Sequence, residues 1–484
     1  MRVTHRLSNL VHKDLAVDPI IEGITADSRK VAPGFLFAAL PGSNEDGRHF
    51  VPQAMARGAA AVLSGEALPG IDAPVVQVAD PRRVYALAAA AFFGAQPTAC
   101  VAVTGTNGKT SVATFCRQIF AAAGHSSASM GTLGVRAGDE QLTPAGLTSP
   151  DAADAARLLA ALCERGVTHL ALEASSHGID QRRLDGVKLS AAGFLNLTQD
   201  HLDYHGTMEA YRTAKLRLFD TLLPRGATAV LNADSDAYGA FAAAAVAGGR
   251  TVISVGAMGQ GLTLTGRTLG AGGQRLKIAA WGQPYELVLP LAGAFQASNA
   301  LVAAGLCIAA GDSPDVVLGA LEGLEGATGR MQFVGAAASG AQAYVDFAHT
   351  PDGLRTVLEA LRPHARGRLV LVFGAGGDRD RSKRPLMGAA AAALADVAIV
   401  TDDNPRSEDP AAIRAQITAG GAGLREVAGR REAIEAAVGL LEAGDVLIVA
   451  GKGHEQDQIV GDEVHPFDDI RETRAALGLE AQGD

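Results

Sequence analysis

The chain has 484 residues, of which 48% are hydrophobic and 19% are charged, and its formal net charge is −10. This composition is typical of a globular protein with several domains and a sizeable core, while the acidic excess argues against a nucleic-acid carrier. Because no apolar segment reaches the uninterrupted length of a membrane span and the N-terminus lacks a signal-peptide core, we expect a cytoplasmic protein without membrane insertion.

The first 97 residues predict a small α/β domain. Apolar, strand-like runs separated by Gly/Pro turns lie at 24–29, 34–40, 59–63 and 75–78. A helix is expected over 81–93, and the dipeptide Gln96-Pro97 that follows it marks a domain boundary.

The rest of the chain alternates strands with helices in two blocks, 98–330 and 331–484. Apolar runs predict strands at 100–104, 169–173, 193–197 and 229–232, and then at 369–373, 397–401 and 446–450. This alternation is typical of parallel sheets with crossover helices. The Gly-rich segment 256–273 predicts inserted turns and hairpins, and a helix is expected over 295–310.

The four cysteines show no metal-ligand spacing. Cys100, Cys116, Cys163 and Cys307 each lie in an apolar run. We therefore expect buried free thiols, which are typical of a protein in a reducing compartment.

The strongest chemical motif is a glycine-rich turn between an apolar strand and a helical pattern over 112–123. The turn reads Gly105-Thr106-Asn107-Gly108-Lys109-Thr110-Ser111. Such a loop wraps backbone N–H groups around phosphates, with Lys109 reaching the β- and γ-phosphates and the Thr110 hydroxyl ligating Mg²⁺. Val103 replaces the first glycine of the common P-loop, so this is a compact Gly-x-x-Gly-Lys-Thr variant. The motif predicts ATP binding, and the alternative is an ordinary βα turn.

Three further candidates depend on their neighbours. Glu173 ends a strand-like run, where it could hold Mg²⁺ beside the phosphate loop, cap a helix or lie in a solvated turn. In the loop 196–206, His201 could ligate metal and His205 could lie near phosphate, or the loop could be a polar turn with capping carboxylates. Lys215 lies in a helix expected over 211–219, and a lysine there indicates, by itself, a solvated charge.

Polar turns in the last third of the chain predict a pocket for an amino acid. The segments 374–380, 402–406 and 451–455 follow apolar runs directly, and Asp346 opens a fourth polar segment. Ligands of open α/β sheets bind at such strand ends. Carboxylates can hold an ammonium group and arginines can bind a carboxylate, so both charges of an amino acid could be matched. The alternative is a set of turns with helix-capping aspartates.

Together these motifs resemble the Mur ligases of peptidoglycan synthesis over essentially the whole chain. The phosphate loop is shared with the whole superfamily, folylpolyglutamate synthases included. More specific are the segments 173–177 (Glu-Ala-Ser-Ser-His) and 403–406 (Asp-Asn-Pro-Arg), which best match the tripeptide-synthetase (MurE) branch of the meso-diaminopimelate-adding type. The segments 27–29 and 41–47 look like that family's UDP-binding domain.

The resemblance implies an α/β protein of three domains. These are an N-terminal UDP-binding α/β domain (1–97), a central P-loop ATPase-like parallel-sheet domain (98–330) and a C-terminal Rossmann-like α/β domain (331–484).

The resemblance also implies the residues that contact each ligand. For the UDP-linked substrate they are Ala26, Ser28, Ser43, Asn44, Glu45, Thr148, Ser149, Ser175, Gln181 and Arg183. For ATP they are the phosphate loop 105–111 with Asn299, Arg330 and Asp346. For diaminopimelate they are Arg379, Asp403, Asn404, Pro405, Arg406, Gly451 and Glu455. Mg²⁺ would lie among Thr110, Glu173, His201 and Lys215, with Lys215 carbamylated, and Lys109 and His205 complete the catalytic set.

The implied reaction is ATP-driven amide formation by a monomer through an acyl phosphate, with domain closure excluding water. Three other kinds of protein share some of these motifs. A folylpolyglutamate synthase is disfavoured by the long block before the phosphate loop, and MurF by the segments 175–177 and 404–406. An ATP-dependent binding protein with an inactive site is disfavoured by the retained Lys109, Glu173, His201 and Lys215.

Overall fold

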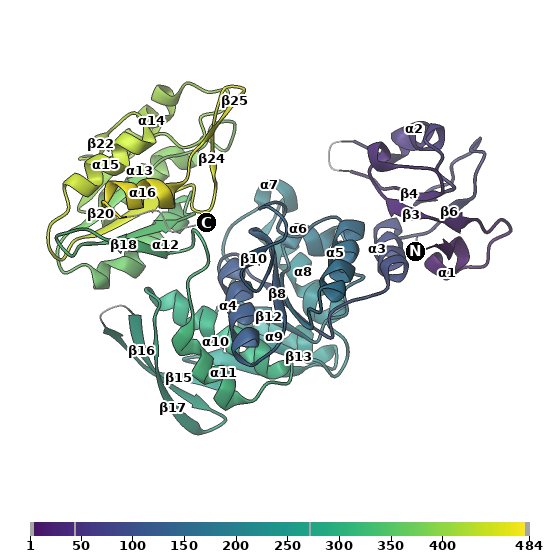
Figure 1. Ribbon diagram of the computed structural model, residues 1–484, viewed down its shortest axis with the longest axis horizontal. Helices are drawn as coiled ribbons and strands as arrows, with labels where there is room; N and C mark the ends of the chain where they lie inside the picture. Colours follow the sequence, from purple (N-terminus) through teal and green to yellow (C-terminus); the bar gives the residue numbers. More distant parts are fainter. Residues whose placement is uncertain (1–3, 43–44, 271–272, 480–484) are drawn as a thin grey trace. The chain divides into compact units, whose positions relative to one another are not determined.

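The computed structural model describes residues 4–42, 45–270 and 273–479, so Ser43 and Asn44 of the expected substrate loop lie outside the described residues. The chain forms two compact units (Figure 1). The first comprises residues 1–264, 279–283 and 301–320, and the second comprises 265–278, 284–300 and 321–484.

A four-stranded parallel sheet forms the N-terminal part of the first unit. Its strands lie in chain order: β3 (Gly23–Thr25), β4 (Phe35–Ala39), β5 (Ala61–Ser64) and β6 (Val75–Gln77). Helices α1 (Leu7–Val11) and α3 (Pro81–Phe93) pack on one face, and η2 (Gly47–Phe50) with α2 (Val51–Ala56) packs on the other. An antiparallel pair, β1 (His5–Arg6) and β2 (Ile20–Ile21), precedes the sheet.

The strand predicted over 24–29 is wrong in its second half. β3 ends at Thr25, and the Asp27 carboxylate accepts a hydrogen bond of 2.9 Å from the Arg29 N–H. This contact caps a 3-10 turn, η1 (Ser28–Lys30), because a short acidic side chain offers backbone donors an alternative to the sheet ladder. Ser28 therefore lies in a tight turn at the end of the strand.

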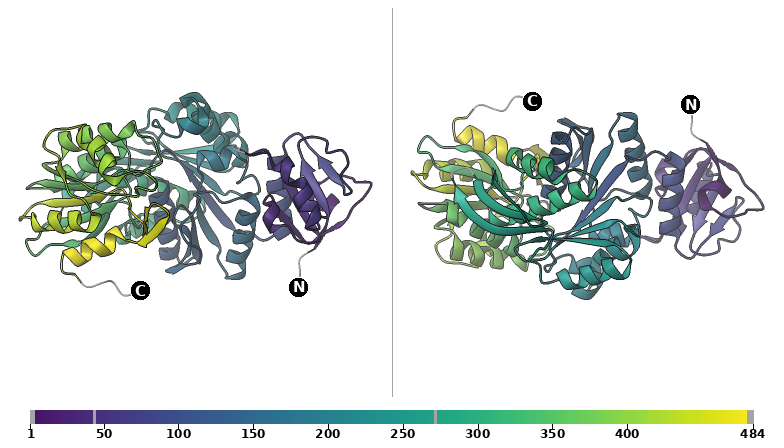
Figure 2. Two further views of the ribbon diagram at one scale, coloured as in Figure 1. Left: turned by 90° about the horizontal axis from the view of Figure 1, so that it is seen from above. Right: turned by 90° about the horizontal axis from the view of Figure 1, so that it is seen from below.

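The middle of the chain forms the sheet that carries the phosphate loop. Its strand order is β10-β9-β8-β11-β7-β12-β13-β14-β15-β16-β17. Figure 2 shows the strands of this part of the chain, coloured blue to teal, in two further views. β7 (Ala99–Thr104) lies between β11 (His169–Glu173) and β12 (Ala191–Phe194), and both run parallel to it. The remaining strands are β8 (Ser127–Gly131), β9 (Gly134–Ala137), β10 (Glu140–Gln141), β13 (Thr228–Asn232), β14 (Thr251–Gly256), β15 (Leu262–Gly270), β16 (Gly273–Ala280) and β17 (Gln283–Leu289).

Helices cover both faces of the central strands. Residues of α4 (Lys109–Ala122) and of the C-terminal half of α10 (Ala294–Ala309) pack on one face. Residues of α5 (Ala152–Glu164), α6 (Ser176–Asp180) and α9 (Tyr238–Ala247) pack on the other. The remaining helices and turns of this part are α7 (Leu202–His205), α8 (Met208–Arg217), η3 (Leu218–Leu222), α11 (Pro314–Ala320) and η4 (Leu321–Gly323).

Two predicted boundaries in this part are displaced. β12 begins and ends earlier than the predicted 193–197, and Asn196 beyond it bonds to the phosphate loop instead of extending the ladder. α8 begins before the predicted residue 211, because the Thr207 hydroxyl caps it by accepting from the Ala210 N–H at 3.2 Å. The helix then ends at Arg217 and continues as the π-helical turn η3.

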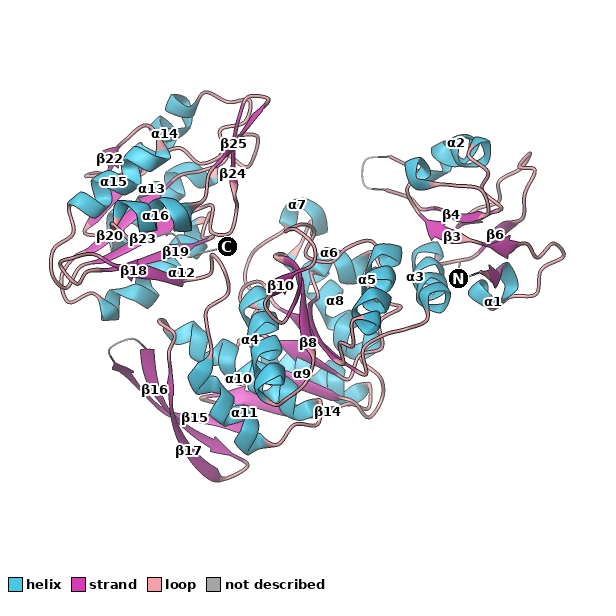
Figure 3. Ribbon diagram, in the orientation of Figure 1, coloured by secondary structure: helices cyan, strands magenta, loops and turns pink. Residues whose placement is uncertain are grey.

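The second unit contains a six-stranded sheet with helices on both faces (Figure 3). Its order is β18-β19-β23-β20-β21-β22, and only β18 is antiparallel to its neighbour. The strands are β18 (Gln332–Ala336), β19 (Gln342–Asp346), β20 (Leu369–Phe373), β21 (Val397–Val400), β22 (Arg425–Glu426) and β23 (Val446–Ala450). Helices α12 (Pro351–Leu361), α13 (Lys383–Leu394) and α14 (Pro410–Thr418) pack on one face, and α15 (Arg430–Gly439) and α16 (Asp469–Ala476) on the other. The turn η5 (Arg362–His364) follows α12, and the hairpin β24 (Asp457–Val460) and β25 (Glu463–Pro466) follows β23.

The α/β fold class with parallel sheets is thus confirmed. Within the described part of the chain, no helix is long and apolar enough to cross a membrane. All four cysteines are free, and Cys100, Cys116 and Cys307 are buried as expected. Cys163 is only half-buried, so the expectation of a buried thiol fails for this residue.

Candidate active site

The phosphate loop joins β7 to α4 and is held in shape by Asn196. The Asn107 N–H donates to Asn196 Oδ1 at 2.9 Å, and Asn196 Nδ2 donates back to the Asn107 carbonyl at 3.2 Å. Gly108 takes a left-handed conformation (φ 91°) immediately before the first residue of α4, a geometry that favours glycine. These contacts hold the loop at the N-terminus of α4, where backbone N–H groups can bind phosphate.

Lys109 folds over its own loop. Its ammonium group donates to the carbonyls of Gly105 and Thr106, both at 2.9 Å. A phosphate oxygen would compete with these neutral acceptors and form a stronger, charge-assisted hydrogen bond.

Glu173, at the end of β11, faces the phosphate loop from the neighbouring strand. The side chain is buried, and its Oε2 accepts from the Thr110 hydroxyl at 3.1 Å. The helix-capping alternative is wrong, because Ser175 caps α6 by accepting from the Gly178 N–H. A carboxylate and a hydroxyl oxygen this close are ligands that suit a hard divalent cation.

Thr132, which sequence reasoning missed, holds this carboxylate in place. Its N–H donates to Glu173 Oε1 at 2.9 Å, and its hydroxyl donates to Oε2 at 3.2 Å. The same hydroxyl lies 2.9 Å from the Thr148 hydroxyl. Because a carboxylate only accepts, the Thr132 proton points to Glu173 and Thr148 donates to Thr132. The position of Thr132, a polar residue directly after β8, is the feature of the sequence that could have identified it.

Gly131 yields a direct test of this geometry. A Cβ at that position would lie 2.1 Å from Glu173 Oε1, so Gly131→Ala must displace the carboxylate. We expect ATP-dependent turnover to fall by a factor on the order of 100, because small misplacements of a catalytic group are costly. Gly239→Ala on α9 is the matched control, since a Cβ there meets nothing within 4 Å. Equal turnover of the two variants in a phosphate-release assay would contradict the placement of Glu173.

Lys215 is buried on α8, so the solvated charge that its local sequence indicates is wrong. Its ammonium donates to the Gly105 carbonyl at 2.9 Å and lies 4.5 Å from the centre of the Tyr211 ring. Burial lowers the pKa of Lys215 well below the ordinary lysine value, and the like charge of Lys109 adds to the shift. A buried lysine with a depressed pKa is more readily neutral, and the neutral amine is the form that reacts with CO₂.

The two predicted histidines lie in an aromatic cluster beside α8. The ring of His177 lies 4.9 Å from that of His201 and 5.5 Å from that of His205, centre to centre. His205 also lies 5.2 Å from Tyr211, whose ring faces the Lys215 ammonium. The cluster therefore connects the loop 196–206 with Lys215, for which the family resemblance implies carbamylation. In the described residues, no three His, Cys, Asp or Glu side chains form a ready-made metal site.

The five side chains expected to hold the dipeptide lie together. The Ser149 hydroxyl is 3.0 Å from that of Ser175, and Thr148 contacts Thr132 as described. Arg183 donates to the Ser149 carbonyl and to Gln181 Oε1, both at 2.7 Å. Hydroxyl, amide and guanidinium groups thus lie together, and Thr148 connects them through Thr132 to the Glu173 carboxylate.

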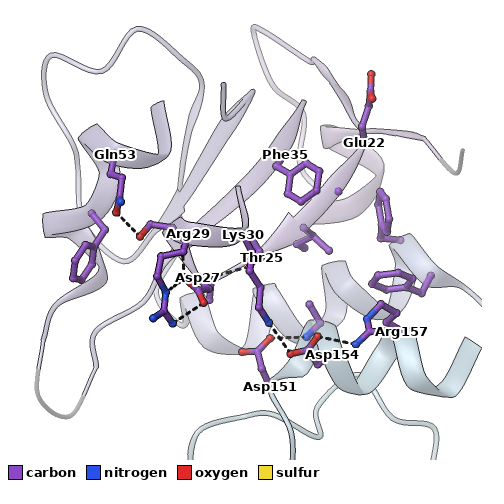
Figure 4. Close-up of a pocket in the computed structure, with 18 of the residues that line it drawn as sticks. Glu22, Thr25, Asp27, Arg29, Lys30, Phe35, Gln53, Asp151, Asp154 and Arg157 are labelled. Atoms are coloured by element: carbon purple, nitrogen blue, oxygen red, sulfur yellow. Dashed lines mark hydrogen bonds and ion pairs between the residues drawn. The ribbon is translucent and has the colours of Figure 1, made fainter. Parts of the chain in front are cut away.

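A cavity of about 1000 Å³ lies between the N-terminal sheet and α5 (Figure 4). Ala26, Ser28 and Glu45 of the expected substrate set line it. Its apolar wall is formed by Ile24, Phe35, Phe92 and Phe93, and its rim carries the ion pair of Lys30 with Asp154 at 3.3 Å. The Ser28 hydroxyl bonds to Gln53 Oε1 at 2.7 Å. A cavity with one apolar wall and a polar rim suits the flat ring and the sugar of a nucleotide.

The residues expected at the nucleotide in the second unit are mostly grouped around Asp346. Its carboxylate accepts from the Met331 and Ala348 N–H groups at 2.6 and 2.7 Å, and burial raises its pKa. The Arg330 guanidinium lies 4.5 Å from the centre of the Phe347 ring. Asn299, on α10, instead bonds to Gln296 Oε1 at 3.0 Å.

The seven residues expected at the amino acid lie at the ends of β20, β21 and β23. Asn404 Nδ2 donates to Glu455 Oε2 at 2.8 Å. Arg406 donates to the Gly377 carbonyl at 2.7 Å, and Arg379, Pro405 and Gly451 flank these loops. A Cβ on Gly451 would lie 2.5 Å from Asp403 Oδ2, so only glycine allows this close approach. Lys452, which lies in one of these motifs without an assigned role, contacts both Asn404 and Glu455.

Models of one family match three successive parts of the chain. The Mur ligase family catalytic domain matches residues 20–93, the Mur ligase middle domain 103–307, and the Mur ligase glutamate ligase domain 329–453.

Curated relatives cover the chain almost completely. A UDP-N-acetylmuramoyl-L-alanyl-D-glutamate--2,6-diaminopimelate ligase from Caulobacter vibrioides is 66% identical and covers 99% of this chain and 100% of its own. A protein of the same name from Agrobacterium fabrum is 54% identical, covering 94% of this chain and 93% of its own.

Solved structures agree with these matches. A structure of a UDP-N-acetylmuramoyl-L-alanyl-D-glutamate--2,6-diaminopimelate ligase has a TM-score of 0.74 at 33% identity and covers 98% of this chain and 99% of its own. A folylpolyglutamate synthase from Mycobacterium tuberculosis shares the fold, with a TM-score of 0.65 at 19% identity over 83% of this chain and 95% of its own. The chain belongs to the Mur ligase family.

Proposed function

We propose that the chain is the ATP-dependent ligase that joins meso-diaminopimelate to UDP-N-acetylmuramoyl-L-alanyl-D-glutamate in peptidoglycan synthesis. The observation that carries this proposal is the 66% identity, over 99% of the chain, to a ligase named for that reaction. The contacts among the phosphate loop, Glu173 and Lys215 support it. We place the reaction in the cytoplasm, where ATP is available and free thiols persist.

The first step forms an acyl phosphate. An oxygen of one of the two free carboxylates of the dipeptide's glutamate attacks the γ-phosphorus of ATP, the bond from that phosphorus to the β,γ-bridging oxygen breaks, and ADP leaves. Lys109 leaves the carbonyls that it contacts and offsets negative charge on the transferring group. Thr110, Glu173, His201 and the carbamate of Lys215 would hold Mg²⁺, which lowers the cost of bringing these anions together.

The second step forms the amide. The amine of diaminopimelate attacks the acyl carbon, phosphate leaves with the bonding electron pair, and the nitrogen loses a proton. Asp403, Asn404, Arg406 and Glu455 bind the charged groups of the amino acid, so that its reacting amine is held in one orientation. Thr148, Ser149, Ser175, Gln181 and Arg183 orient the dipeptide in the same way.

The proposal is tested by phosphate release from the purified chain. Release should require ATP, Mg²⁺, the UDP-linked dipeptide and diaminopimelate together, and omission of any one should return it to background. Release that is independent of the UDP-linked dipeptide would contradict the proposed function.

Arg406 is expected to select diaminopimelate over L-lysine, which lacks the distal carboxylate. Its backbone is left-handed (φ 51°) and anchored by its N–H to the Ile459 carbonyl at 3.0 Å, so the guanidinium starts from a fixed point. When L-lysine is the substrate, this guanidinium has no carboxylate partner, which lowers the binding free energy by about 2–4 kcal/mol. We therefore expect the ratio of kcat/KM for the two amino acids to fall about 30-fold or more in Arg406→Ala. The exposed Arg425 supplies the control, Arg425→Ala. Unchanged selectivity in Arg406→Ala would refute the role.

A further inference from the structure

We propose that Lys452 is a positioning residue that fixes the Glu455 carboxylate and the Asn404 amide, so that Glu455 presents its Oε1 to an ammonium group of the amino-acid substrate. This inference rests on the proposed function and deepens it. The residue is not assigned to the site by the sequence motifs, and its role follows from its contacts.

The Lys452 side chain is completely buried two residues after the end of β23, where an ammonium group needs full compensation. Its Nζ donates to Asn404 Oδ1 at 3.1 Å and to Glu455 Oε2 at 3.2 Å, and a third hydrogen bond reaches the Asp457 carbonyl. An ammonium group has three donors, so these contacts use them all. Two of the three acceptors belong to side chains expected at the amino acid.

These contacts settle how the Asn404 amide is turned. Its Oδ1 accepts from Lys452 and also from the Ile459 N–H at 3.0 Å. The opposite orientation would place the amide nitrogen against two donors and is therefore excluded. Asn404 Nδ2 consequently points to Glu455 Oε2, at 2.8 Å.

Among the residues that the structure describes, Glu455 is held through its Oε2 oxygen. Oε2 accepts from both Lys452 and Asn404, and the side chain is 35% exposed although Lys452 is not exposed at all. The carboxylate is thus fixed from its buried side, which leaves Oε1 as the oxygen directed to a ligand. A fixed acceptor binds an ammonium group with less loss of side-chain entropy than a mobile one.

The stability of the fold does not require the buried contacts of Lys452 with Asn404 and Glu455. Buried ion pairs are often replaced by apolar side chains without loss of stability, because desolvation offsets the attraction between the charges. If Lys452 only filled space in the core, a methionine at this position would serve as well. The convergence of its donors on Asn404 and Glu455 is what connects Lys452 to substrate binding.

The test is the variant Lys452→Met, compared with Lys277→Met, whose lysine is exposed on β16. We expect KM for diaminopimelate to rise roughly tenfold or more in Lys452→Met. KM for ATP and for the UDP-linked dipeptide should stay within about twofold, and kcat at saturating diaminopimelate within about threefold, because only binding of the amino acid is lost. An unchanged KM for diaminopimelate, or an equal rise of all three KM values, would overturn the proposal.

A second variant covers the case in which Lys452→Met does not fold, since it leaves Glu455 half-buried and uncompensated. In Lys452→Met/Glu455→Gln both charges are removed, and we expect a Tm within about 5 °C of the parent with KM for diaminopimelate still raised. Failure of both variants to fold would show a purely structural lysine and would overturn the positioning role. If the parent itself releases no phosphate with diaminopimelate, the proposed function fails. If the parent is active and Lys452→Met has the same KM for diaminopimelate, only the positioning role of Lys452 fails.

Discussion

Lys109→Ala is expected to abolish turnover, with kcat lowered by a factor on the order of 1000. The ammonium group is held at the mouth of the phosphate loop by the Gly105 and Thr106 carbonyls. From there it would reach the phosphoryl group on which charge moves in the transition state. Its effect should fall on kcat, because the charge it offsets is greatest during transfer.

The control for this prediction is Lys188→Ala, which removes an exposed lysine from the same unit. The rate to be measured is phosphate release at saturating ATP, UDP-linked dipeptide and diaminopimelate, with circular dichroism to show that both variants are folded. Near-normal release by a folded Lys109→Ala variant would rule out the assigned role of the loop.

Lys215→Ala is expected to be nearly inactive and to regain part of its activity when short carboxylic acids such as acetate are added. The ammonium group first loses a proton, and the neutral amine then combines with CO₂ to give a carbamate and a second proton, so that a cation becomes an anion. The site favours this change, because the ammonium form is buried beside a second lysine and its pKa is lowered well below the ordinary value. Alanine leaves a gap that a small carboxylate can fill.

The modification itself can be observed without reference to activity. Isotopically labelled bicarbonate should give a carbamate signal by NMR in the parent and none in Lys215→Ala. Absence of this signal from the parent in the presence of bicarbonate and Mg²⁺ would count against carbamylation. Failure of acetate to restore any activity would count against the role of the anion.

The parts of the fold that the sequence predicted best have strong local signals. The apolar run before the phosphate loop, the loop and the helix after it lie in one element pair, β7 and α4, with boundaries close to those expected. The errors arose where a side chain competes with the backbone. Asp27 ends β3 early, and Thr207 starts α8 early, and neither contact follows from hydrophobic periodicity.

The candidate site was less accessible to sequence reasoning, because its contacts join residues far apart in the chain. Lys215 has an ordinary amphipathic neighbourhood, and its burial depends on Gly105, a residue 110 positions away. Thr132 and Lys452 likewise act on Glu173, Asn404 and Glu455 through bonds that the folded sheets create. Motifs locate such a site, while its supporting contacts require the structure.

The most direct test of the central claim is the identity of the products. The purified chain is incubated with ATP, Mg²⁺, diaminopimelate and UDP-N-acetylmuramoyl-L-alanyl-D-glutamate whose free carboxylate oxygens carry heavy oxygen. Mass spectrometry should show the UDP-linked tripeptide and one heavy oxygen atom in each released phosphate, because that oxygen bridges the acyl phosphate. Phosphate without heavy oxygen, or ATP consumption without tripeptide, would contradict amide formation through an acyl phosphate.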